Sequence, residues 1–384
     1  MSGAAGAAWD VVSTTASLLW MAAWALVLGY AFSSAIQVFV KPAEAADRLG
    51  GGGVRDVSLA AGLGFISSSC SFAALAATRA LWVKGARLES ALAFMFASTN
   101  LVIELGVLLW IFLGWEFVVA LYLGAAILIP VMVVLVRLTY PERLGEEARR
   151  RAGEVQGSEM DPAEGLDASW RGRLRDRRAW SRVGDRFVAE WRMAGREIAF
   201  GFLVAGAIAT LVPREVFETA FPGVGPQWLQ AVLHAVIAPV AAVVTFIGSM
   251  GNGPLAALLW ENGVAFAGIM AFLAADFVVP PSLKINANYY GWRFSLYLAA
   301  VFTAAAVISG VVLHALFAHV GLTPDRDVRL AERASFGLDH TFLLNLLALA
   351  VAAVLLGLRR ARLAGERAGG PHRPSARATK RPEA

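Results

Sequence analysis

The chain has 384 residues, of which 58% are hydrophobic and only 16% are charged, and mean hydropathy is +0.60. This composition cannot cover a water-facing surface, so it excludes a soluble enzyme and a nucleic-acid-binding protein. The basic residues exceed the acidic ones by 34 to 29, and the arginines cluster from Arg137 to Arg196 and after Leu358, a distribution that indicates membrane orientation rather than DNA binding.

Long apolar blocks recur along the chain, each of about 20 residues or more, which is the length that crosses about 30 Å of hydrocarbon. They are Val11–Val40, Val57–Val83, Leu88–Leu113, Phe117–Val136, Glu197–Val212, Trp228–Trp260, Val264–Tyr290, Phe294–Ala318 and Thr341–Leu358. Met1–Asp10 carries no basic n-region or cleavage signal, so we expect the first block to remain as a span. The blocks predict an all-α, multi-pass protein of the cell inner (plasma) membrane with about 8–10 membrane segments.

Two polar segments divide the chain. Residues 140–196 are rich in Arg, Glu, Asp and Gly and predict a cytoplasmic polar linker, and residues 359–384 predict a basic, disordered tail that rests on anionic lipid. The remaining domains are then a first membrane repeat, 1–139, a second membrane repeat, 197–320, and an extra C-terminal span, 321–358.

An internal repeat relates the two membrane segments. The run Phe65–Ser71 (FISSSCS) recurs as Phe246–Asn252 (FIGSMGN), and a Gly-Trp-x-Phe element follows each, at Gly114–Phe117 and at Gly291–Phe294. If the blocks holding these runs are re-entrant hairpins, the basic segments all lie on the cytoplasmic side, whereas spanning blocks would place many of them outside. We therefore expect two inverted repeats with broken or re-entrant helices.

The repeated runs carry polar and helix-breaking residues inside apolar blocks. Hydroxyl groups and freed backbone groups at membrane depth must meet protein, ligand or a water-filled cavity, so the runs predict a substrate path. The candidate residues of this path are Ser68, Ser69, Cys70, Ser71, Ser249, Met250, Gly251, Asn252, Pro254 and Asn100. The alternative is close packing of helices through small residues.

These residues resemble the predicted permeases that include ArsP-like organoarsenical efflux permeases. The resemblance rests on Ser68–Ser71 with Ala73, Ala74 and Arg79, on Ala97–Gly106, on Gly251–Asn252 with Pro254–Ala257, Leu259 and Trp260, and on Tyr289–Arg293. It implies a multi-pass permease that in some members exports trivalent organoarsenicals or other thiol-seeking species, with motif cysteines handling the soft atom. This chain has Gly248 where related sequences carry a second cysteine.

Cys70 is the single cysteine, so a two-thiolate site within one chain is excluded. Cys70 remains a candidate ligand for a soft metal or metalloid, with Met250 as a second sulfur donor, although a lone cysteine in a membrane also occurs as plain apolar packing.

Glu104, Asp276 and Lys284 are ionisable residues within the apolar blocks, where each costs about 2.5 to 3.5 kcal/mol on insertion scales. Asp276 or Glu104 is expected to titrate during transport and to couple it to protons, with Lys284 as a candidate counter-ion. Asn100 precedes Glu104 by four residues, which places both on one face if the helix continues. The alternatives are a static ion pair and, for Lys284, a side chain that extends to a nearby surface.

The sequence thus predicts a secondary, proton-coupled exporter of a small solute such as an organoarsenical, metalloid or soft metal species. No cofactor and no enzyme activity are expected, a homo-oligomer is possible, and neither a zinc-type histidine pair nor a GxxxxGK nucleotide loop occurs in the sequence. The alternatives are a passive channel, an intramembrane enzyme with Cys70 as nucleophile, and a non-transporting partner that recruits another protein through its linker.

Overall fold

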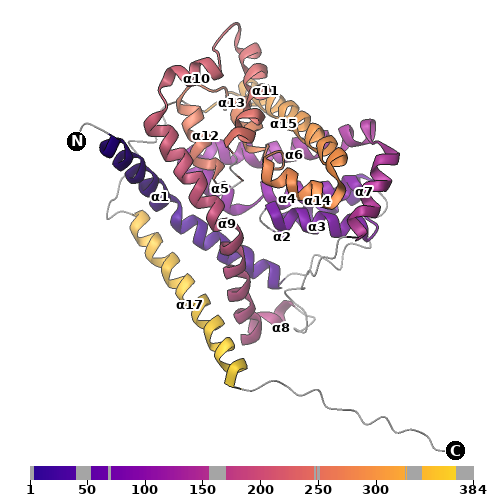
Figure 1. The fold of residues 1–384 in the computed structure, drawn as a ribbon, viewed down its shortest axis with the longest axis vertical. Coiled ribbons are helices and arrows are strands. Elements are labelled where there is room, and N and C mark those ends of the chain that lie inside the picture. The colour runs from indigo at the N-terminus through magenta and orange to yellow at the C-terminus, as the bar shows by residue number, and fades with distance from the viewer. Residues whose placement is uncertain are drawn as a thin grey trace, which may run out of the picture.

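The computed structural model describes residues 4–39, 53–67, 71–154, 170–245, 248, 251–324, 326 and 340–368, and these residues form helices joined by turns, without strands. Six of the described helices are long and apolar enough to cross a membrane, and a seventh span results if α4 and α5 count as one bent span (Figure 1). The expectation of an all-α, multi-pass protein is confirmed. The count falls below the 8–10 expected membrane segments because several apolar blocks are divided into shorter helices.

The first half of the chain contains a long helix, a helix pair, a bent pair and a second long helix. These are α1 (Ala4–Phe39), α2 (Val54–Ser67), α3 (Ser71–Val83), α4 (Leu88–Asn100), α5 (Ile103–Phe112) and α6 (Trp115–Thr139). Both α2 and α3 lie along α4, since Gly64 approaches Ala97 and the Thr78 hydroxyl lies 3.4 Å from the Ala91 carbonyl. The helices α4 and α5 meet at an angle of 44°.

The second half repeats this order. It contains α9 (Arg177–Leu211), α10 (Arg214–Ala220), α11 (Gln227–Thr245), α12 (Asn252–Glu261), α13 (Phe266–Leu273), α14 (Pro280–Tyr290) and α15 (Trp292–Val320). The two Gly-Trp-x-Phe elements have the same local structure. Gly114 (φ 107°, ψ 173°) precedes α6 and Gly291 (φ 86°, ψ 155°) precedes α15, in a region of backbone space that only glycine enters readily.

Helices α1 and α9 form a long antiparallel pair. Near one end Thr15 fills the space beside Gly206, and further along the rings of Tyr30 and Trp191 meet edge to face, 5.4 Å apart. The loss of a Cβ at residue 206 permits this approach, because a side chain there would overlap Thr15.

The ends of α3 and α12 lie at opposite ends of α6. Trp260, near the end of α12, packs against Phe117 in the first turn of α6, with ring centroids 5.3 Å apart. Trp82, near the end of α3, stacks on Phe294 at the start of α15, also at 5.3 Å. The start of α15 in turn lies at the far end of α6, where the Thr139 and Tyr297 hydroxyl groups are 3.2 Å apart.

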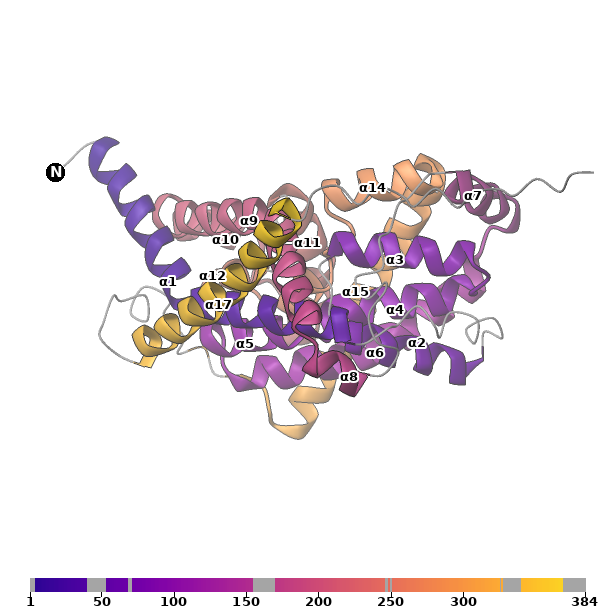
Figure 2. The ribbon, with the colours of Figure 1, turned by 90° about the horizontal axis from the view of Figure 1, so that it is seen from below.

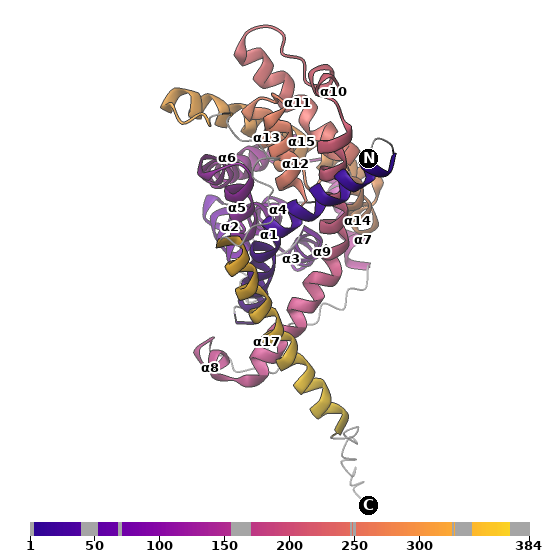
Figure 3. The ribbon, with the colours of Figure 1, turned by 90° about the vertical axis from the view of Figure 1, so that its left-hand side faces the viewer.

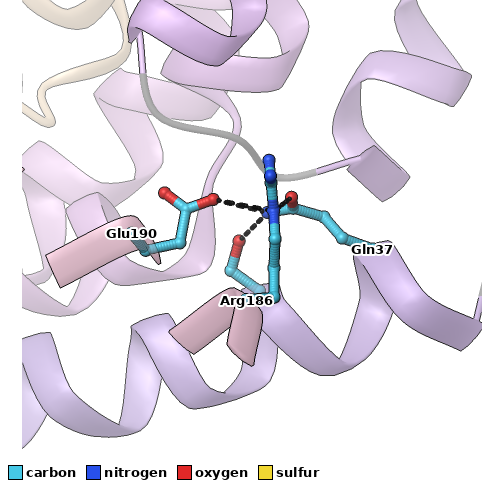
Figure 4. Close-up of polar contacts among 4 residues, drawn as sticks. Gln37, Arg186 and Glu190 are labelled. Atoms are coloured by element: carbon cyan, nitrogen blue, oxygen red, sulfur yellow. Dashed lines mark hydrogen bonds and ion pairs between the residues drawn. The ribbon is translucent and has the colours of Figure 1, made fainter. Parts of the chain in front are cut away.

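The residues expected to form a linker are largely helical where they are described, which differs from the expectation. They form α7 (Glu142–Glu154), α8 (Trp170–Arg175) and the first twenty residues of α9, and α7 packs beside α14 (Figure 2). The segment orders because it gains partners rather than a core of its own. Arg186 lies between Gln37 of α1 and Glu190, and the Gln37 amide donates to Glu190 over 3.1 Å (Figure 4).

Helix α17 (His340–Ala368) extends ten residues beyond the expected end of the last span at Leu358. Its last turns run beside the start of α9, and both helices extend away from the rest of the molecule (Figures 1 and 3). Arg359 and Arg362 both form ion pairs with Asp185. Gly184 allows α17 to lie close to α9, because an atom of α17 lies 2.5 Å from the position that a Cβ on residue 184 would occupy. The start of the expected tail is therefore helix held by ion pairs, and residues 369–384 lie outside the described residues.

Candidate functional site

The candidate site lies where α12 begins and the connection between α13 and α14 passes. The Asn252 amide donates to the Asp276 carboxylate over 2.7 Å, and both side chains are buried. Asn252 is the last residue of the second repeated run, and Asp276 was expected to matter from its position inside an apolar block. The structure brings them together although 24 residues separate them.

A non-helical segment positions Asp276. Helix α13 ends at Leu273 and α14 begins at Pro280, because Pro280 and Pro281 disfavour helix in the preceding residue and Val279 is extended (φ −62°, ψ 148°). The Ser282 hydroxyl donates to the Asp276 carbonyl over 3.1 Å. The neighbouring Phe277 packs edge-on against Phe96, with centroids 5.2 Å apart, which holds the turn in place.

The start of α12 is equally constrained. Residues 251–260 are all buried, and the Gly251 and Asn252 amides donate to the Gly248 carbonyl over 3.0 and 3.2 Å. Pro254 lies in the first turn, where its missing N–H removes no helical hydrogen bond. The Asn252 Oδ1 atom is buried and accepts no hydrogen bond from the described residues.

Asn100 lies beside a second helix interruption, at Leu101 and Val102. It ends α4 and lines a cavity of about 20 Å³ between both halves of the chain, which is bounded by α6, by Ala274 at the end of α13 and by Ser309 of α15. Its Nδ2 atom is buried and has no hydrogen-bond partner in the described part of the chain. A cavity of this size holds about one water molecule.

Glu104 does not share a face with Asn100. The condition for a shared face, a helix that continues from Asn100 to Glu104, is not met, because Leu101 and Val102 leave helical geometry and α5 starts at Ile103. Glu104 is buried in the first turn of α5, and its side chain fills the space beside Gly29 of α1, where a Cβ would lie 2.8 Å from the Glu104 Cβ.

The role of Lys284 as a counter-ion of Asp276 stays a prediction. The Lys284 side chain is exposed on α14, and no ion pair at Lys284 occurs among the described residues. On the same helix Asn286 is buried, so the Asn286 side chain faces the interior of the protein and the Lys284 side chain faces outward. This placement agrees with the lower cost of an ammonium that reaches a surface.

The first repeated run is only partly described. Ser71 begins α3 and is half-buried. The remaining candidates of both runs, Ser68, Ser69, Cys70, Ser249 and Met250, lie outside the described residues, as does any test of Cys70 as a metal ligand. In the part of the chain that is described, no group of three or more His, Cys, Asp and Glu side chains could hold a metal ion.

Glu197 is a site residue that the sequence reading passed over. It lies on α9, and its carboxylate rests against Gly248, so that a Cβ on residue 248 would overlap it and would lie 2.5 Å from its Cδ atom. In the sequence Glu197 follows a run of arginines and marks the edge of an apolar block, so it resembled an interfacial residue. The one available signal was its position as an acid that opens the apolar run Glu197–Val212.

A larger cavity of about 300 Å³ lies along α12, from its first turn to its end. Its apolar wall includes Pro254 and Leu258 of α12, and its polar lining comes from Arg214, Glu261 and Asn262. It is bounded by α1, α9, α10 and α12, so it extends from the first turn of α12 to the turn that follows this helix.

The described residues form an all-helical fold with six or seven candidate spans and with buried polar groups at helix interruptions, and these features are those of a multi-pass membrane protein of the permease class. Residues 8–315 match a family model described as "predicted permease" and designated ArsP_1, and the chain belongs to this family. It is 37% identical over 332 residues to a protein of Mycobacterium tuberculosis named "Putative permease Rv2963", an alignment that covers 83% of this chain and 81% of that protein. No solved structure matches.

Proposed function

We propose that this permease is a secondary, proton-coupled exporter of a small solute, built from two inverted repeats. The solute would pass between the repeated runs, and the carboxylates next to them would carry protons. The observation that carries this proposal is the hydrogen bond between Asn252 and Asp276. This hydrogen bond involves an ionisable group at a helix interruption inside the membrane segment. Burial of an acid there costs free energy, so such a residue is usually retained for a function.

Reciprocal contacts support the inverted arrangement. Trp82 follows the first repeated run and packs on Phe294 of the second Gly-Trp-x-Phe element, while Trp260 follows the second run and packs on Phe117 of the first element. Two equivalent contacts at opposite ends of α6 are what a two-fold axis in the membrane plane would produce. In this proposal each repeated run joins the two helices of one hairpin, α2 to α3 or α11 to α12, and the hairpins enter from opposite sides.

The positive-inside tendency orients this arrangement. With α7 and the start of α9 in the cytoplasm, the end of α17 with Arg359 and Arg362 also lies there, since both pair with Asp185 of α9. The α2–α3 hairpin is then cytoplasmic, because the Arg79 side chain donates to the Ala152 carbonyl of α7 over 2.8 Å. The α11–α12 hairpin enters from the outside.

The two cavities fit a closed path. The small cavity beside Asn100 lies between the two interrupted spans, and the 300 Å³ cavity lies along α12 at the outer end. In the orientation proposed here the larger cavity is an outer vestibule that reaches the first turn of α12 at Pro254. An alternating-access cycle would connect it to the inner side by movement around the Asn252–Asp276 pair.

The cargo we propose is an organoarsenical, a metalloid or a soft metal species. This rests on the family to which the chain belongs and on the sulfur atoms of Cys70 and Met250 in the repeated runs. The name of the Mycobacterium relative describes a permease and does not specify a substrate.

The function is tested in everted membrane vesicles, in which an imposed proton gradient drives uptake of the compound. Uptake of phenylarsine oxide and antimonite is compared with resistance of a deletion strain to the same compounds and to silver and copper. We expect Asp276→Asn to abolish proton-driven uptake and Glu104→Gln to lower it by about tenfold or more. The matched control is Glu215→Gln, which removes an exposed carboxylate on α10 and should leave uptake unchanged.

The outcomes separate the alternatives. Uptake that ignores the proton gradient in wild-type vesicles would favour a passive channel. Full activity of both the Asp276→Asn and Glu104→Gln variants would end the proton-coupled mechanism. A transport function that persists in Cys70→Ser would argue against a Cys70-dependent enzyme and against Cys70 as an essential ligand.

A further inference from the structure

The Glu197 carboxylate occupies space that would otherwise belong to a side chain at residue 248. Gly248 is buried, and a Cβ placed on it would lie 2.5 Å from Glu197 Cδ and 3.2 Å from Oε2. The neighbouring residues Ala194 and Ile198 are buried and fix the face of α9. The contact therefore requires a glycine at residue 248 as long as the Glu197 side chain lies against it.

Glu197 has no charged partner in the described part of the chain, where no hydrogen bond or ion pair reaches its carboxylate. The helices packed against α9 hold their charges elsewhere. Helix α1 carries Asp10 near its start, α12 carries Glu261 at its end, and α17 pairs Arg359 and Arg362 with Asp185, twelve residues earlier on α9. On α9 itself the nearest charged side chains, Arg192 and Arg196, are exposed.

Gly248 connects this carboxylate to the Asn252–Asp276 pair. The Gly248 carbonyl accepts from the Gly251 and Asn252 amides, and the buried Asn252 side chain donates to Asp276. A chain of contacts thus runs from Glu197 through Gly248 and Asn252 to Asp276. A carboxyl group that has neither a cation nor a hydrogen-bond donor beside it favours its protonated form when it leaves bulk water.

We propose that Glu197 binds and releases a proton at the second repeated run, and that it acts with Asp276 rather than with Glu104. The inference rests on the proposed function for its purpose, since a proton carrier at this position serves a proton-coupled permease. The chemistry is a simple equilibrium in which a carboxylate oxygen gains a proton from water on one side of the membrane and loses it to water on the other. Glu104 packs instead at the contact of α5 with α1.

The test uses dicyclohexylcarbodiimide, an apolar reagent that adds to a protonated carboxyl group and gives a stable N-acylurea where water is scarce. The purified full-length protein is treated in detergent over a series of buffers from acidic to alkaline, and adducts are located by peptide mass spectrometry. We expect an adduct on Glu197 whose yield falls by about tenfold per unit once the pH exceeds the value at which the acid ionises. Glu215, which is exposed on α10, serves as the internal control and should form no stable adduct.

A second readout distinguishes a proton-carrying role of Glu197 from a purely structural one. Glu197→Gln keeps the shape against Gly248 but cannot release a proton, so uptake into vesicles should lose its pH dependence while the protein remains folded. Gly248→Ala should displace the carboxylate and lower the adduct yield, and Glu197→Ala combined with Gly248→Ala should restore the melting temperature that Gly248→Ala lowers.

Two results would overturn the proposal: an unlabelled Glu197 in monodisperse protein at every pH, or an unchanged pH profile of uptake in Glu197→Gln. Labelling does not depend on transport. If Glu197 reacts as expected and vesicles transport none of the compounds tested, the proton site stands and the proposed exporter function fails. If vesicles transport but Glu197 fails both readouts, only this inference falls.

Discussion

The hydrogen bond between Asn252 and Asp276 lies in a setting where both side chains are buried. The loss of either side chain would leave the other without this donor or acceptor, which costs free energy when the remaining group stays buried. The Asn252 Oδ1 atom is also buried, and it accepts no hydrogen bond from the described residues. The contact is therefore expected to contribute to the stability of this helix interruption.

An exchange of the two side chains tests how specific this contact is. Asn252→Asp places two carboxylates at the 2.7 Å contact and should lower stability by about 1–3 kcal/mol, because like charges oppose each other in a buried place. The double variant Asn252→Asp with Asp276→Asn restores one amide and one carboxylate. It should recover most of the stability, with a coupling of about 1 kcal/mol or more in the cycle. Thermal unfolding in detergent measures this, and additive effects of the two changes would show that the contact is absent in solution.

At the scale of helices, the interruptions have different origins, and this decides which of them could be predicted. The break before α14 follows from Pro280 and Pro281, and the break before α12 follows from the glycines of the second run, so both were expected. The bend between α4 and α5 has no proline or glycine. Thr99, Val102 and Ile103 are β-branched and weaken helix locally, but tertiary packing decides the bend. The sequence therefore left open whether one helix continues from Asn100 to Glu104.

Burial of a residue could be predicted where its neighbours in the sequence are apolar. It could not be predicted where it depends on a contact between two segments that are distant in the sequence. Asp276 lies amid apolar neighbours, and the structure confirms that it is buried. Glu197 and Gly248 belong to different helices, and their contact depends on how α9 crosses the α11–α12 connection, which no local pattern encodes. The order in residues 170–196 depends in the same way on α1 and α17, whose side chains supply the partners that the segment lacks by itself.

The paired glycines before α6 and α15 give a prediction for these elements. Gly114→Ala or Gly291→Ala should each lower stability by about 1–3 kcal/mol, since a side chain rarely adopts either conformation. The matched control is Gly62→Ala in α2, where a Cβ meets nothing within 4 Å and helix propensity should raise stability by up to about 1 kcal/mol. Thermal unfolding of the three variants compares them, and a melting temperature of Gly114→Ala equal to that of Gly62→Ala would contradict the account.

At the scale of the whole molecule, the long α1–α9 pair and α17 form one part, and the two hairpins with the interrupted spans form the other (Figures 1 and 3). Polar contacts tie the first part together at its end, through Gln37, Glu190 and Asp185. The second part contains the aromatic contacts of Trp82 and Trp260 at opposite ends of α6. A rigid frame beside a more interrupted element suits a permease in which one part moves against the other.

The proposed inversion of the halves makes a prediction about which side of the membrane each hairpin faces. Cys70 is the only cysteine, so a Cys70→Ser background removes all native thiols and allows single cysteines to be introduced. Lys84 follows the α2–α3 hairpin and Gln227 opens the α11–α12 hairpin, and both are exposed. A membrane-impermeant maleimide applied to intact cells should label Gln227→Cys and should label Lys84→Cys only after the membrane is permeabilised.

The sequence-equivalent pair Glu116→Cys and Arg293→Cys provides the control. These residues occupy the same place in the two Gly-Trp-x-Phe elements, yet inversion requires Glu116 outside and Arg293 inside, and the opposite signs of their charges agree with this. Parallel repeats would place each equivalent pair on the same side. If Lys84→Cys and Gln227→Cys are labelled from the same side, the hairpins cannot enter from opposite faces, and a path that joins Asn252 to the first repeated run across the membrane is no longer possible.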